Sequence, residues 1–356
     1  MASTLGDFTL SAVAAPDDFI VGYDEAALNG ERRWTVSTIA NAVSGIITPA
    51  LVETPAFTGT FKNKIINGNF DIWQRGTSLG SGTGVRYLAD RFVNSSNGST
   101  YTVSRQSFSN GQADVPNNPS YFHRTVVSSV AGNGNSANFA TTIESVKNLA
   151  GKTATLSFYA KADSNKSVSV EFQQFFGTGG SPSSQVTGIG VQKLNLTSSW
   201  QNFTVTVNIP SIAGKTIGTN NNDYLAVAFW FDAGSNWNSN TNSLGQQSGT
   251  FDIAQVQLEE GSVATPFENR PIGTELALCQ RYYFSLASIS GSRWDGAGSY
   301  SDFTIVYPVP MRSIPTVSAT FGAGNSVPTV LYDSAIFRAT AGNHVSAQNV
   351  NFLAEL

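Results

Sequence analysis

The sequence has little cysteine, histidine and charge, and each shortage excludes a class of protein. Cys279 is the single cysteine, so no disulfide can form within the chain, and one cysteine with two histidines cannot build a Cys/His zinc cluster. Charged residues are only 12% of the 356, about half the share of an ordinary soluble domain. The net charge of −4 and the pI near 5.2 argue against a nucleic-acid partner, which needs clustered lysine and arginine.

Long hydrophobic runs are also missing, so we expect no insertion into a membrane. The opening MASTLGDFTL lacks a basic region and an apolar core, and we expect no secretory signal. Hydrophobic residues still reach 40% and aromatic residues 11%, too many for a disordered chain. The sequence therefore predicts a folded protein, made in a reducing cytosol, that owes its solubility to uncharged polar residues.

The first two segments of the chain are short. Residues 1–44 predict a small α/β module with a strand at 17–24 and a helix over 35–43, whose apolar stripe follows helical spacing. Such a module buries little surface alone, so we expect it to dock on a partner. Residues 45–63 read as an extended linker, because two Thr-Pro steps favour extended backbone.

The segment 64–270 alternates apolar and polar residues as half-buried antiparallel strands do. Apolar residues fill both faces of 223–232, which predicts a central strand. The apolar phase slips by one residue between Ile253 and Val256, which predicts a β-bulge. These strands and their polar loops predict a two-sheet sandwich. The absence of a repeat of about 20–25 residues argues against a β-helix.

The segment 271–356 opens with a predicted short helix and then returns to strands bounded by Pro, Gly and Asn. The boundaries predict a second, smaller β domain. The whole chain is therefore expected to be mainly β.

Three stretches, in this order, resemble the jelly-roll domain of carbohydrate-binding modules as embedded in bacteriophage tail fibres. They are NKIINGNFDIWQRGTS (63–78), LSFYAKAD (156–163) and FDIAQVQLEEGSVATPFENRP (251–271). ELALCQRYYF (275–284) is similar to a segment that often follows this domain in phage fibres. Residues 17–43 resemble the virion-docking segment of such fibres.

The resemblance implies a jelly-roll β-sandwich in a homotrimeric receptor-binding protein of the virion, most often a tail fibre, made in the host bacterial cytoplasm. Residues 1–44 would bind other tail or head proteins, and residues 271–356 would hold the trimer or contact the receptor. The implied function is attachment to host surface glycans without catalysis. Two alternatives stay open. The first is a purely structural virion fibre or adaptor that binds no ligand, and the second is a capsule depolymerase.

Aromatic rings that stack on sugars supply the candidate binding residues. Trp237 lies in a polar loop with no other aromatic residue, and Trp294 lies in similar surroundings. Tyr121, in NNPSYFHR, is a further candidate. Trp294 could instead lie at a subunit contact. Trp230, inside an apolar strand, is expected in the core.

A metal or a catalytic centre has weak support in the sequence. Modules of the resembled kind often hold a structural calcium ion near the first and last strands, where Asp71 and Asp252 lie. Two carboxylates fall short of the six or more oxygens that calcium takes, so we expect no cofactor and keep calcium as an alternative. The adjacent pair Glu259-Glu260 points to opposite faces of a strand, and no catalytic motif occurs, so we expect no enzyme.

Overall fold

The computed structural model describes residues 19–23, 31–35, 61–291, 301–339 and 345–356. The chain divides into two units, Met1–Thr60 and Phe61–Leu356.

In the first unit, β1 (Phe19–Tyr23) and β2 (Glu31–Thr35) form an antiparallel pair. The predicted strand at 17–24 is therefore confirmed, and the stretch expected to lead into a helix is itself a strand. The predicted helix beyond Thr35 lies outside the described residues, as does most of the linker.

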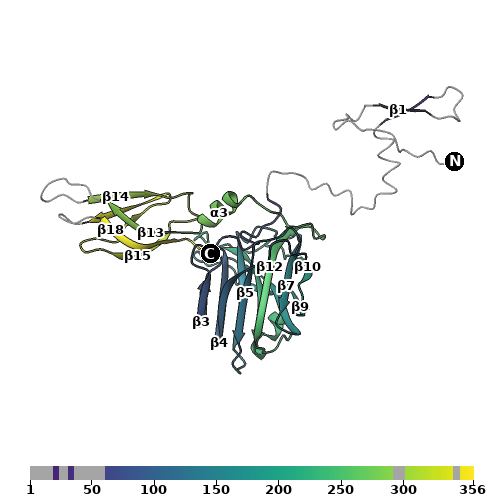
Figure 1. Cartoon of the computed structure of the whole chain (residues 1–356), viewed down its shortest axis with the longest axis horizontal. Helices are drawn as coiled ribbons and strands as arrows, with labels where there is room; N and C mark the ends of the chain where they lie inside the picture. The colour runs from purple at the N-terminus through teal and green to yellow at the C-terminus, as the bar shows by residue number, and fades with distance from the viewer. Residues whose placement is uncertain (1–18, 24–30, 36–60, 292–300, 340–344) are drawn as a thin grey trace. The chain divides into compact units, whose positions relative to one another are not determined.

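The second unit begins with a ten-stranded antiparallel sheet that folds into two layers (Figure 1). The ten strands are β3 (Ser78–Tyr87), β4 (Phe92–Ser107), β5 (Tyr121–Ser128), β6 (Ser136–Glu144), β7 (Thr153–Ala162), β8 (Lys166–Phe175), β9 (Val186–Leu196), β10 (Gln201–Asn208), β11 (Tyr224–Ala233) and β12 (Gly249–Glu260). Their order is β10-β7-β12-β5-β4-β6-β11-β8-β9, with β3 beside β4. The first layer holds β10, β7, β12 and β5, and the second holds β6, β11, β8 and β9.

Both layers share β4. Its residues 92–97 pair with β6, and its residues 100–107 pair with β5. Between these halves, Gly98 has φ +71°, a conformation that glycine adopts without steric cost. The strand can therefore turn from one layer into the other at this point.

The core lies between the layers, and strand alternation decides which residues enter it. On β11, Leu225, Val227 and Phe229 are buried in this core. β11 lies between β6 and β8, so the prediction of a central strand is confirmed. The predicted bulge in β12 is also confirmed, because its register with β7 shifts after Ala254 and Gln255 has φ +48°.

After α3 (Ile272–Gln280), two three-stranded sheets complete the unit, in the orders β13-β18-β15 and β14-β17-β16. Their strands are β13 (Tyr283–Gly291), β14 (Ser301–Val306), β15 (Thr316–Phe321), β16 (Thr329–Val330), β17 (Ser334–Ala339) and β18 (Val345–Leu353). They bury a core of their own, in which the rings of Phe284 and Phe352 stack at 4.3 Å. The fold is thus mainly β, a jelly-roll sandwich followed by a short helix and further strands.

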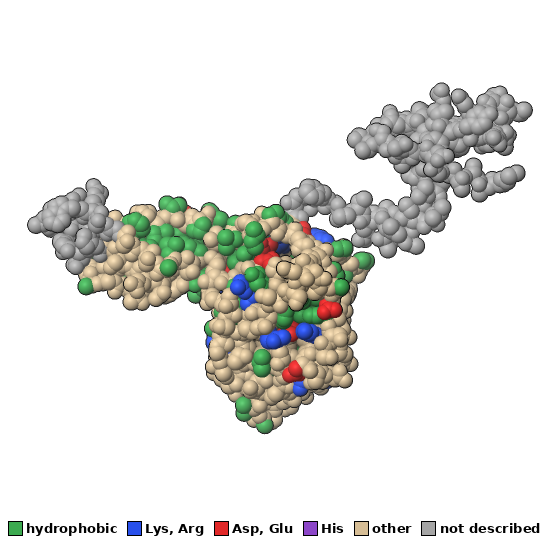
Figure 2. Space-filling model, viewed as in Figure 1, with side chains coloured by type: hydrophobic (Ala, Val, Ile, Leu, Met, Phe, Trp, Pro, Cys, Tyr) green, Lys and Arg blue, Asp and Glu red, His purple; other side chains and the backbone are tan. Residues whose placement is uncertain are grey.

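Little of the surface in view is charged (Figure 2), in keeping with the composition. In the part of the chain that the structure describes, no helix combines the length and the apolar content needed to cross a bilayer.

Candidate functional site

A groove of about 510 Å³ lies on the outer face of the second layer. Its floor consists of small side chains on neighbouring strands, Ala140 on β6 with Ala226 and Ala228 on β11. Ala228 lies directly across from Ala140 in the sheet. Because these side chains are small, the middle of the sheet face stays open between the larger side chains around it.

Aromatic side chains flank the floor. Trp230 and Trp237 pack together with ring centroids 5.1 Å apart, and Trp237 is half-buried. Trp237 ends the short helix η2 (Ser235–Trp237), and its indole N–H donates to the carbonyl oxygen of Gly134 at 3.1 Å. Tyr224, also half-buried, lines the groove at the start of β11. The groove therefore has a fixed indole near one end of β11 and a phenol at the other.

The expectation that Trp230 is a core residue is confirmed, and the core that it joins is a small second cluster. Trp230 is buried, with 4% of its surface exposed, but it packs in a separate cluster with Trp237 and Leu244. Trp230 lies an even number of residues from Tyr224 and Ala228. Side chains alternate between the two faces of a strand, so all three lie on the groove face of β11.

Side-chain amides supply the polar part of the lining. They belong to Asn138, Gln173, Gln185 and Asn240. Among the described residues that line this groove, none is Asp, Glu, Lys or Arg. The lining side chains can therefore exchange hydrogen bonds with hydroxyl groups, and none of them carries a charge.

Residues near the end of the sequence border the groove beside β3. The phenol of Tyr87 donates to the carbonyl oxygen of Leu356 at 3.3 Å, and both residues line the groove. Glu355 pairs with Arg75 at 3.0 Å and with Arg91. Burial raises the pKa of Tyr87 to about 12, so the phenol stays protonated and remains a donor.

Of the three predicted sugar-binding residues, the structure brings one into the groove, Trp237. Tyr121 begins β5 with its ring under the guanidinium of Arg105, 4.2 Å from the ring centroid, and it does not line the groove. Trp294 lies outside the described residues.

The sequence analysis missed Tyr224 and the lining amides. A signal for Tyr224 was present, because one face of 223–232 carries two small alanines between Tyr224 and Trp230. The amides lie on β6, on β8, just before β9 and in α2 (Asn238–Thr241), carry no such pattern and meet only in the folded sheet.

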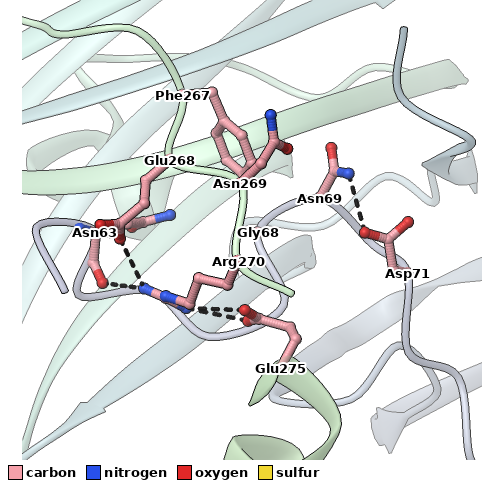
Figure 3. Close-up of a pocket in the computed structure, with 9 residues that line it drawn as sticks. All are labelled: Asn63, Gly68, Asn69, Asp71, Phe267, Glu268, Asn269, Arg270 and Glu275. Carbon is pink, nitrogen blue, oxygen red and sulfur yellow. Dashed lines mark hydrogen bonds and ion pairs between the residues drawn. The ribbon is translucent and has the colours of Figure 1, made fainter. Parts of the chain in front are cut away.

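The two predicted calcium ligands have different partners. Asp71 lies in a small cavity of about 20 Å³, room for one water molecule, and accepts a hydrogen bond from Asn69 at 2.9 Å (Figure 3). Burial, as the largest cause, raises the pKa of Asp71. Asp252 instead accepts two hydrogen bonds from Arg124, at 2.7 and 2.8 Å.

The sheet register explains this separation, because Asp252 of β12 lies directly across from Arg124 of β5. In the cavity that holds Asp71, Arg270 pairs with Glu268 at 3.5 Å and with Glu275 at 3.1 Å (Figure 3). Within the described ranges, no three His, Cys, Asp or Glu side chains are grouped so that they could hold a metal ion.

Comparisons with known proteins give likenesses of fold. No protein-family model matches the chain, and no curated protein sequence matches it. A solved structure described as "CBM4 structure and function" is 18% identical, with 55% of this chain and 98% of that chain covered and a TM-score of 0.31. The family 11 carbohydrate-binding module from Clostridium thermocellum, in complex with a mixed-linked tetrasaccharide, is 11% identical, with 52% and 99% covered and a TM-score of 0.31.

A phage protein is also among the matches. The enzymatically active domain of tailspike protein 4 from bacteriophage CBA120 is 14% identical, with 56% of this chain and 22% of that chain covered and a TM-score of 0.32. At such low identities, these likenesses concern the fold alone.

Proposed function

We propose that this chain is a non-enzymatic, glycan-binding protein of a virion that attaches a bacteriophage to sugars on its host. The observation that carries the proposal is the uncharged groove, in which Trp237 and Tyr224 stand beside side-chain amides. Indole and phenol rings pack on the apolar face of a pyranose, and amides bind its hydroxyls. The volume of about 510 Å³ falls in the usual range of ligand sites, about 300–1,000 Å³.

The absence of charge in the lining selects among glycans. A uronic acid, sialic acid or phosphate group would lose its hydration in this groove and meet no cation, which is costly. The ligand is therefore a neutral sugar chain.

Binding without catalysis is supported by the same lining. A glycosidase places two carboxyl groups on either side of the scissile bond. None of the described lining residues carries a carboxyl side chain. We propose no cofactor, since the hydrogen bonds described above need none.

The virion role is supported by the order of the phage-fibre resemblances along the sequence. Under this proposal residues 1–44 dock on other tail or head proteins, and the protein is made in the host cytoplasm and then resides in the particle.

A homotrimer is supported by apolar side chains that the C-terminal strands and their loops leave uncovered. Figure 2 shows hydrophobic side chains gathered over the region of α3 and β14. Val306 and Val327 are both 75% exposed, and Ile314 is 62% exposed. Self-association would cover such side chains, and three linked weak sites gain avidity through effective concentration.

Trp237→Ala tests the groove. Calorimetric titration with cellohexaose, xylohexaose and mannohexaose should detect binding to the wild type, and the variant should lose about 1–3 kcal/mol of binding free energy with the stacking surface. Trp200→Ala is the matched control, because Trp200 packs on Phe108 and Phe122 away from the groove. It should bind like the wild type.

Other outcomes would favour the two alternative functions. A blank titration, followed by a blank glycan array with the intact protein, would favour the structural fibre without a ligand. Shortening of host capsule or lipopolysaccharide on incubation with the protein would favour the depolymerase.

A further inference from the structure

A buried carboxylate lies on the β8 side of the groove floor. Glu171 of β8 has 0% of its surface exposed. Four uncharged groups donate hydrogen bonds to it: Gln173 Nε2 at 2.8 Å, Asn240 Nδ2 at 2.6 Å, Trp230 Nε1 at 3.0 Å and the backbone N–H of Gly188 at 2.6 Å. Within the described part of the chain, no Lys or Arg pairs with Glu171.

The local backbone explains how these donors reach Glu171. The register between β8 and β9 shifts between Val170 and Phe172, so the regular ladder is interrupted at Glu171. Gly188 has φ +70° there and directs its N–H to the carboxylate instead of to the neighbouring strand. Such an irregularity re-aims groups at the face of a sheet.

The two carboxyl oxygens of Glu171 accept all four of these hydrogen bonds, and this fixes the direction of the amides around it. Gln173 and Asn240 must turn their NH₂ groups to Glu171. The carbonyl oxygen of Gln173 then accepts from Gln185 Nε2 at 2.9 Å. Gln185 is exposed, and no described residue bonds to its carbonyl oxygen, which remains an acceptor for a ligand hydroxyl.

The same carboxylate also holds the aromatic side of the groove. It fixes the indole N–H of Trp230, and the ring of Trp230 supports the ring of Trp237. Asn240 lies three residues beyond Trp237, in α2 (Asn238–Thr241). One buried group thus connects the stacking surface with the amides.

We propose that Glu171 is a positioning residue of this groove, which orients the chain of amides Gln173–Gln185 and Asn240 so that acceptor oxygens face the sugar hydroxyls, and which holds Trp230 beneath Trp237. This inference rests on the proposed function. It adds that the ligand donates hydroxyl hydrogen bonds at the Gln185 side of the groove.

Glu171→Gln tests the proposal, with Asp232→Asn as the matched control. Asp232 is also fully buried, accepts hydrogen bonds from Ser99, Ser129 and the backbone of Gln247, and does not line the groove. Both changes replace a buried carboxyl group by an amide of the same shape. With the neutral hexaose that the wild type binds most tightly, Glu171→Gln should raise Kd by about tenfold or more, and Asp232→Asn should leave Kd within about twofold. Equal Kd values for Glu171→Gln and the wild type would overturn the proposal.

A second readout needs no sugar. In heteronuclear NMR, the side-chain NH₂ groups of Gln173 and Asn240 should be slow to exchange with solvent in the wild type and in Asp232→Asn. They should exchange fast in Glu171→Gln. Slow exchange in all three proteins would contradict the role of Glu171. Failure of the wild type to bind any hexaose, together with a blank glycan array, would refute the proposed function, and the exchange rates would still decide the orienting role.

Gln173→Leu covers the outcome in which Glu171→Gln does not fold. It breaks the connection between Glu171 and Gln185 at a half-buried position. It should raise Kd by about tenfold, and adding Gln185→Leu should then cost little more, because the two act in one chain of hydrogen bonds. Additive losses would show that Gln185 acts without Glu171.

Discussion

His123 shows how far burial in this sandwich can shift the pKa of a single side chain. Its ring stacks on Phe139 at 4.0 Å and on Trp73 at 5.9 Å, and its Nε2 lies 3.0 Å from the hydroxyl of Thr125. Loss of hydration lowers the pKa of His123 from 6.5 to about 3. The imidazole is therefore a neutral part of the core near neutral pH.

This pKa shift makes stability depend on pH. Well above pH 6.5 the imidazole is neutral in both states, so it contributes no slope. Below that value the unfolded chain binds a proton that the folded chain excludes, and the free energy of unfolding falls by about 1.4 kcal/mol per pH unit until pH reaches about 3. His123→Gln removes this titration. In urea unfolding, its loss of stability between pH 7 and 4.5 should be smaller than that of the wild type by about 2–3 kcal/mol. An identical loss in both proteins would mean that His123 is not held neutral.

Among the elements, the turn after β11 decides the form of the groove. Its sequence is polar and reads as a loop, yet it forms the two short helices η2 and α2. Thr241 Oγ1 donates to the carbonyl oxygen of Trp237 at 2.8 Å, and the indole of Trp237 donates to Gly134. The stacking residue is thus held by the next turn and by a neighbouring loop, which limits the entropy lost on binding.

Gly234→Ala should disturb this element. A Cβ at Gly234 would collide with the backbone carbonyl oxygens of Gly132 and Asn133, so the loop that holds the Trp237 indole must move. We expect the free energy of unfolding to fall by about 1–3 kcal/mol in urea unfolding, with weaker hexaose binding in titration. Gly80→Ala is the control, since nothing lies within 4 Å of its added Cβ. A Gly234→Ala protein as stable as this control would contradict the close packing.

At the scale of the molecule, the second unit has two well-buried hydrophobic cores but leaves some large apolar side chains exposed to solvent. The main core joins side chains from both layers, and the C-terminal strands bury a smaller one. Valine and isoleucine side chains nevertheless remain exposed on the C-terminal strands and their loops. These side chains, rather than the groove, are the surface that we assign to association between copies of the chain.

Light scattering after gel filtration tests this assignment. The wild type at micromolar concentration should have a mass three times that of the 37.7 kDa chain. The double variant Val306→Ser and Val327→Ser should shift the mass toward one chain, because two exposed apolar groups leave the interface. Val263→Ser, at a valine that is 51% exposed before α3, should not change the mass. A monomeric wild type would refute the trimer.

Much of the fold could be predicted, because strand patterns are local. The alternation in 152–162 and 203–209, the central strand and the β12 bulge all agree with the structure. The sequence could not show that Trp230 joins a separate cluster beside the groove, because an apolar strand with two buried faces looks the same whether its second face meets a core or the floor of a groove.

The sequence by itself determined the low charge, the strands and the face to which each side chain points, because these follow from composition and from a period of two along each strand. Only the tertiary structure decided which segments meet. Glu171 and Trp230 come from two strands, Asn240 from α2 and Gln185 from the loop before β9. The order of strands in the sheet brings them into one network of hydrogen bonds, which Gln185 joins through Gln173. That order depends on long-range burial and register, which no local pattern encodes.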